Sequence, residues 1–140
     1  MVNLKNENID IAITCSDIVK TRYFFEKILG LDVVAEFKVD KSTANNLGLA
    51  PEGFTQTRFA MGDTKIKLLE FDSLEVNSTN HHSEISQGVR WITLYVNDIC
   101  ETYETLESKG YGFIGDVPTK SKGALVLKGP EGILIEFIGS

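Results

Sequence analysis

Two glutamates at corresponding strand positions are the residues of this sequence best suited to chemistry. Glu70 lies in the run Leu69-Glu70-Phe71, and Glu136 lies in the matching run Ile135-Glu136-Phe137. A carboxylate embedded in a strand is costly to bury unless it is paired. Each glutamate is therefore a candidate for metal ligation or proton transfer. The alternative is a cavity carboxylate that hydrogen bonds or a nearby cation hold in place.

Asp10 and Trp91 occupy matching places near the start of two similar stretches, IDIAITCSDIVK and GVRWITLYVNDICE. In each stretch the side chains alternate as they do along a strand, and the stretch then reaches an Asp followed by Ile, at Asp17 and Asp98. These two aspartates are 98 − 17 = 81 positions apart, a little over half the chain. The sequence therefore predicts one structural unit that occurs twice, with the function located where the two copies meet.

Periodicity and turn residues predict the same order of elements in both halves, namely a strand, a helix and three further strands. Each helix begins at an Asp that can cap free backbone amides and ends at a glycine. The fold class is therefore α+β, with two tandem βαβββ modules at about 8–71 and 89–139, joined by a linker at 72–88. The first-half strands are expected at 9–16, 31–37, 54–61 and 64–71, with a helix between Asp17 and Gly30 and a possible short helix near 43–47. The second-half strands are expected at 90–97, 113–114, 124–128 and 133–138, with a helix between Asp98 and Gly110.

Alternation within the strands also predicts which side chains share a face. In the first strand, the apolar set of Ile9, Ile11, Ile13 and Cys15 is typical of a face packed on a helix, whereas Asp10, Ala12, Thr14 and Ser16 resemble a cavity wall. Later strands place together Ile66, Leu68 and Glu70, and then Trp91, Thr93 and Tyr95. We assign Asp10, Glu70, Trp91 and Glu136 to the sheet faces without a helix, where Thr14, Leu68 and Thr93 would also contact a ligand.

Composition and charge exclude several classes of protein. The 140 residues suit a single domain with a sizeable core. The net charge of −6 argues against nucleic-acid binding. No apolar run approaches the length of a membrane span, and the N-terminus lacks the apolar core of a signal peptide. Cys15 and Cys100 have no spacing motif and are expected to be reduced, so we expect a cytoplasmic protein.

With this order of elements, the chain resembles the vicinal oxygen chelate superfamily, which includes glyoxalase I, bleomycin-resistance proteins, extradiol dioxygenases and methylmalonyl-CoA epimerase. The residues that carry the resemblance are IAITCSDIVKTRYFFEKILGLDVV, KIKLLEF, WITLYVNDI and GPEGILIEFIG. The resemblance implies that the two modules form a cupped mixed sheet with the helices on the outside. It also implies a homodimer, in which each cup is built within one chain or across two.

The resemblance further implies where a metal would bind. Metal-dependent members place a His seven residues before the Asp that starts each helix, and those positions are Asp10 and Trp91 here. Their acidic ligands match Glu70 and Glu136. The indole of Trp91 offers only an N–H donor, so at most three carboxylates remain as metal ligands: Asp10, Glu70 and Glu136. Such a set suits Mg²⁺ or Mn²⁺ better than zinc or nickel.

Three further features each have two interpretations. Trp91 and Tyr95 form either an aromatic wall that stacks on a flat ligand or part of the core between sheets. Arg58 could clamp a carboxylate or phosphate, neutralise Glu70, or lie at the surface. The adjacent His81 and His82 would point apart on an extended chain, so we expect a solvated loop rather than a metal pair.

Two functions follow from these expectations. The first is a metal-independent binding protein, similar to the drug-sequestering resistance members, that holds a small aromatic or cationic ligand and needs no cofactor. The second is a lyase or isomerase resembling glyoxalase I or the epimerases. In the second, Glu70 and Glu136 would bind one divalent metal ion or move a proton, with Asp10 as a third ligand. Neither function involves a membrane or nucleic acid.

Overall fold

The computed structural model describes residues 1–140 and divides into two compact units. Unit 1 is Met1–Asn77 and unit 2 is Ser78–Ser140. The boundary falls inside the predicted linker at 72–88, which contains neither helix nor strand. Each unit has its own four-stranded mixed sheet. The structure thus confirms the predicted α+β fold with two tandem modules.

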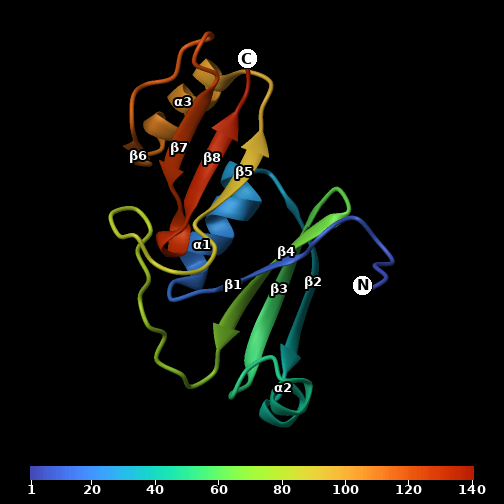
Figure 1. Ribbon diagram of the computed structural model, residues 1–140. Coiled ribbons are helices and arrows are strands. Elements are labelled where there is room, and N and C mark those ends of the chain that lie inside the picture. The colour runs from blue at the N-terminus through green and yellow to red at the C-terminus, as the bar shows by residue number, and fades with distance from the viewer. The chain divides into compact units, whose positions relative to one another are not determined.

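Unit 1 contains the sheet β1-β4-β3-β2 (Figure 1). Strand β1 runs parallel to β4, whereas β2–β3 and β3–β4 are antiparallel pairs. The elements in chain order are β1 (Ile11–Thr14), α1 (Ile18–Tyr23), a π-helical turn (Phe24–Ile28), β2 (Asp32–Val39), α2 (Lys41–Leu47), β3 (Phe54–Met61) and β4 (Thr64–Phe71). The excursion expected at 38–53 therefore does hold a short helix, α2.

The sheet of unit 1 buries one face against α1 and the π-helical turn. On this face Ile13, Ile66 and Phe59 are buried, and the ring of Phe25 lies 6.0 Å from that of Phe59. Ile13 is paired with Leu68 in the parallel register, and directly paired residues of neighbouring strands share a face. The core of unit 1 therefore lies between this face and its helix.

Unit 2 repeats the arrangement with the sheet β5-β8-β7-β6 (Figure 1). Strand β5 runs parallel to β8, and the β8–β7 and β7–β6 pairs are antiparallel. The elements are β5 (Trp91–Tyr95), α3 (Ile99–Ser108), β6 (Phe113–Ile114), β7 (Ala124–Lys128), a 3₁₀ turn (Pro130–Gly132) and β8 (Leu134–Ile138). Strands β3, β4, β6 and β7 have the boundaries that the sequence predicts.

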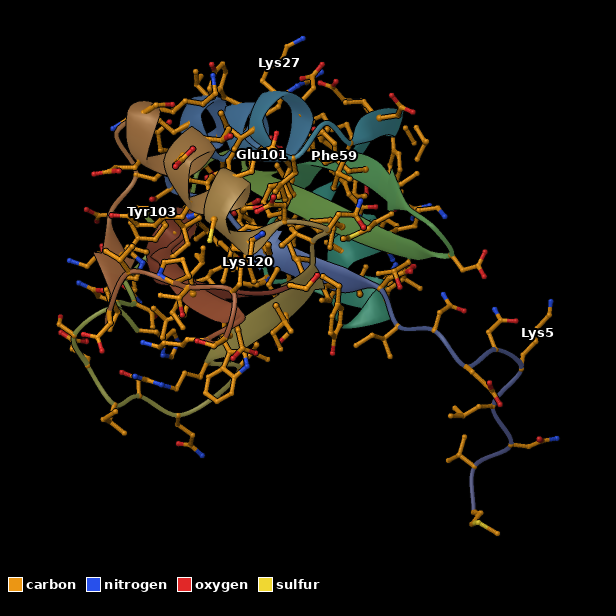
Figure 2. The ribbon with its side chains drawn as sticks, turned by 90° about the horizontal axis from the view of Figure 1, so that it is seen from above. Lys5, Lys27, Phe59, Glu101, Tyr103 and Lys120 are labelled. Carbon is orange, nitrogen blue, oxygen red and sulfur yellow. The ribbon has the colours of Figure 1, made fainter.

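Helix α3 covers one face of this second sheet. Ile99 and Leu106 of α3 are buried, as are the apolar side chains of the strands at Leu94, Leu127 and Ile135. Tyr103 of α3, labelled in Figure 2, lies with its ring centroid 4.8 Å from that of Phe113 on β6. The opposite face of the sheet has no helix from unit 2.

Aspartates begin all three helices, because a carboxylate can accept from a free backbone amide in the first turn. Asp17 accepts from the amide of Lys20 at 3.1 Å, Asp40 from Thr43 at 2.7 Å and Asp98 from Glu101 at 3.0 Å. The predicted caps at Asp17 and Asp98 are confirmed. These caps set the point at which β1 and β5 end and therefore which residues remain on each strand.

Candidate functional site

The open face of unit 2 is the sheet face opposite α3, and it carries four of the predicted site residues. Trp91, Thr93 and Tyr95 lie on β5 and are paired with Leu134, Glu136 and Ile138 of β8. Trp91 is 53% exposed and Tyr95 is 78% exposed, so neither ring fills the core of unit 2. The predicted grouping of Trp91, Thr93, Tyr95 and Glu136 on one face therefore agrees with the strand register.

Glu136 has one hydrogen bond on this face. The hydroxyl of Thr93 donates to its Oε1 at 2.8 Å across the parallel β5–β8 pair. The carboxylate is half-buried, and it keeps acceptor positions that this one bond does not use. Glu136 is therefore held in a defined position and can accept from a further donor or meet a cation.

The open face of unit 1 is the sheet face opposite α1, and it carries Asp10, Thr14 and Arg58. The residue Thr14 is paired with Leu69, and Arg58 is paired with Lys67. The carboxylate of Asp10 accepts from the Lys65 amide at 3.0 Å and forms an ion pair with Lys67 at 3.3 Å. The amide hydrogen bond, with a smaller contribution from Lys67, holds the pKa of Asp10 below its usual value.

Glu70 does not lie on that open face, so the prediction that it accompanies Asp10 is wrong. Its strand neighbours Ile66 and Leu68 are buried on the α1 side, and side chains two positions apart on a strand share a face. Leu68 is 0% exposed within that core, so it is not available to a ligand on the open face either. Asp10 and Glu70 therefore cannot bind the same ion within unit 1.

Instead, Glu70 lines a cavity of about 220 Å³ on the α1 side of the sheet. The cavity is also lined by Arg22 and Glu36, whose side chains form an ion pair at 3.0 Å, and by the β3 threonines Thr55 and Thr57. The ion pairs with Glu36 and with Glu26 raise the pKa of Arg22. Because Arg58 lies on the opposite face, it does not neutralise Glu70.

The two histidines of the linker are not a solvated loop, and this prediction is also wrong. His81 is 6% exposed, and its backbone amide donates to the carbonyl of Gly132 at 2.9 Å. The Nε2 of His82 lies 3.0 Å from the carbonyl oxygen of Gly129 and 3.1 Å from that of Ile133. The linker is packed on the turn between β7 and β8, some 50 residues further along the chain, which no local pattern predicts.

Within each unit the structure assembles no cluster of three metal-ligating side chains. The open face of unit 1 carries two carboxylates, Asp10 and Asp32, and that of unit 2 carries one, Glu136. Lys67 and Gln56 are the functional candidates that the sequence analysis missed, although the alternation in β3 and β4 places both of them beside Arg58. No helix meets the length and hydropathy that a membrane span requires.

The chain belongs to the Glyoxalase/Bleomycin resistance protein/Dioxygenase superfamily, whose family model matches residues 9–137. This match confirms the resemblance found in the sequence. No protein with a curated description matches the chain.

Solved structures support the same fold. A glyoxalase family protein from Bacillus cereus has 21% identity and a TM-score of 0.77, and the match covers 99% of this chain and 98% of that one. The trypanothione-dependent glyoxalase I of Leishmania major has 18% identity and a TM-score of 0.68, covering 93% and 84%. TnmS3, an antibiotic binding protein from a Streptomyces species, has 15% identity and a TM-score of 0.62, covering 98% of both chains.

Proposed function

We propose that this protein binds a small, flat ligand on the open face of unit 2. The observation that carries the proposal is the pair of exposed rings, Trp91 and Tyr95, two positions apart on β5. Large exposed aromatic groups that point the same way mark interaction sites, because they gain free energy when another apolar surface covers them. The rings would stack on the ligand, and Glu136 beside them would receive its polar group.

The position of Glu136 favours a ligand with a cationic or N–H donor group. The carboxylate accepts from Thr93 and has no cation of the protein within ion-pairing distance. A positively charged aromatic molecule would satisfy both the rings and this carboxylate. TnmS3, an antibiotic binding protein of similar fold, gives a precedent for ligand binding by this fold. In this proposal the protein needs no cofactor, acts as a homodimer and is cytoplasmic.

The test uses Trp91, the only tryptophan of the chain, as an internal fluorescent reporter. Proflavine, a planar aromatic cation, should change the emission of Trp91 on binding, and neutral acridone of similar shape should bind more weakly. Calorimetry on Trp91→Ala should show proflavine binding weakened by about 1–3 kcal/mol, which is the magnitude for a buried aromatic contact. Tyr23→Ala is the matched control, because Tyr23 is an exposed aromatic residue of unit 1. Equal affinity in Trp91→Ala and in the unaltered protein would refute the proposal.

The second candidate function is a lyase or isomerase that resembles glyoxalase I. The hydrogen bond from Thr93 favours it, because Glu136 is held in place and has free acceptor positions, as a base or metal ligand requires. Glu136→Gln should then abolish turnover of a glutathione hemithioacetal while the protein stays folded. Turnover that survives this substitution would exclude the role.

A further inference from the structure

Arg58 on β3 is a half-buried cation without a carboxylate partner. Its side chain forms no ion pair, whereas Arg22 of the same unit forms ion pairs with Glu26 and Glu36. A charge that is partly withdrawn from water is costly unless an opposite charge or hydrogen bonds compensate it. The guanidinium of Arg58 therefore has an unused capacity for an anion.

Two neighbours on the same face fix the guanidinium in position. Its Nε donates to Oε1 of Gln56 at 2.6 Å, and Gln56 is only 8% exposed. The carbon at the centre of the guanidinium lies 5.0 Å from the ring centroid of Phe37 on β2. Because Nε is occupied and one side is covered by the ring, both terminal nitrogens remain available as a two-pronged donor. Such a fork matches the two oxygens of a carboxylate or phosphate.

The charges around Arg58 also favour an anion. Lys67 is the direct β4 partner of Arg58, and Lys65 follows on the same face of that strand. Two carboxylates share this open face: Asp10, which is engaged by Lys67 and by the amide of Lys65, and Asp32, which is paired with Ala60 at the start of β2. Three cations and two anions leave this surface with a net charge of +1, although the whole chain carries −6. A local positive surface on an acidic protein attracts anions selectively.

We propose that the open face of unit 1 is an oxyanion site, with Arg58 as the bidentate donor and Lys67 as the second cation. Its ligand is a small molecule that carries a carboxylate or a phosphate-type group, because each of these anions offers two oxygens to a guanidinium fork. Gln56 is the positioning residue, because it holds the fork through Nε. The inference does not depend on the aromatic ligand proposed for unit 2, since all of its residues belong to unit 1.

The test exploits the presence of only three arginines, Arg22, Arg58 and Arg90. Their Nε–H groups give three signals in a nitrogen-15 NMR spectrum, and Arg58→Lys identifies the Arg58 signal by its disappearance. Titration with inorganic phosphate and with propionate, at ionic strength held constant with chloride, should move the Arg58 signal and leave the Arg22 signal in place. The anion with the lower Kd identifies the chemical class.

Variants decide between a site and a general surface effect. Arg58→Gln should weaken the preferred anion at least tenfold, measured by calorimetry or through backbone amide shifts on β3 and β4. Gln56→Leu should weaken it less and should move the Arg58 signal in the absence of anion. Arg90→Gln is the matched control, because Arg90 lies in unit 2 and donates to the carbonyl of Glu84. Trp91→Ala should bind the anion normally, which separates this inference from the proposed function. An Arg58 signal that does not move with either anion would overturn the proposal. So would an anion affinity of Arg58→Gln equal to that of the unaltered protein.

Discussion

At the scale of single residues, Asp10 shows how local contacts reassign a side chain that a family pattern would make a metal ligand. Both oxygens of its carboxylate are already engaged, one by the Lys65 amide and the other by the Lys67 ammonium. A metal ion would have to displace the ammonium and compete with the amide. The contacts therefore favour a structural role, in which Asp10 ties the start of β1 to β4 and holds Lys67 beside Arg58.

This role predicts a specific pH dependence for Asp10. The Lys65 amide is the largest cause of its lowered pKa and Lys67 adds less, so Lys67→Met should raise the pKa while leaving it below the usual aspartate value. A pKa that is lowered by folding stabilises the fold above the ordinary pKa of the group, and this contribution is lost as the pH falls through the lowered value. NMR titration of the Asp10 carboxyl carbon checks both statements.

Asp40 is the internal control for that titration, because the amide of Thr43 lowers its pKa through a contact remote from Lys67. Its pKa should be the same with and without Lys67→Met. An Asp10 pKa at the usual aspartate value in the unaltered protein would show that the carboxylate is not held as described.

At the scale of elements, the alternation of side chains along the sequence predicted the strands correctly. The analogy with metal-binding relatives, however, placed the side chain of Glu70 on the wrong face of its sheet. The boundaries of β3 and β4 follow from a polar turn between two alternating runs, a signal that depends on neighbouring residues only. The same alternation places Glu70 on one face with Ile66 and Leu68. The structure confirms this, because Ile66 and Leu68 are both buried on the α1 side of the sheet. The analogy with metal-binding relatives moved Glu70 to the other face. On β8 no such conflict arises, and Glu136 lies where it was predicted.

The linker shows what local patterns cannot predict. Its sequence is polar and without period, yet His82 bonds to carbonyls at both ends of the turn between β7 and β8. Contacts between segments some 50 residues apart depend on the folded position of the turn, which leaves no trace in the linker itself. Gly132 permits the contact, since its φ of 74° suits glycine and a Cβ there would clash with the carbonyl of Thr79.

We therefore expect the two histidines to differ in their contribution to stability. His82→Ala removes the contacts with Gly129 and Ile133 and should lower the free energy of unfolding by about 1–2 kcal/mol. His81→Leu should cost much less, because Nδ1 of His81 is buried without a hydrogen-bond partner and leucine removes that unsatisfied atom. Urea unfolding of the two variants checks the order. A larger loss for His81→Leu than for His82→Ala would contradict it.

At the scale of the whole molecule, the two units share a topology but differ in the chemistry of their open faces. The face of unit 1 carries Arg58 and Lys67, and that of unit 2 carries Trp91, Tyr95 and Glu136. One sheet design repeated within a chain thus supports two kinds of surface, since the side chains of an open face do not have to pack against the helix of their unit. This difference also determines what the molecule can do with a metal ion.

The open face of unit 1 contains two carboxylates, Asp10 and Asp32, that of unit 2 contains one, Glu136, and neither face contains a histidine. Divalent cations such as Mg²⁺ and Mn²⁺ bind several oxygen ligands, and Asp10 is already paired with Lys67. We therefore expect protein purified without a histidine tag or chelator to contain far less than one divalent metal ion per chain, measured by inorganic mass spectrometry after exposure to Mn²⁺, Ni²⁺ and Zn²⁺. Lys67→Met frees the Asp10 carboxylate and should increase the metal content, whereas Lys122→Met, which breaks an exposed ion pair with Asp116, should not. Near-stoichiometric metal that disappears in Glu136→Gln would contradict this expectation and would favour the lyase over the binding protein.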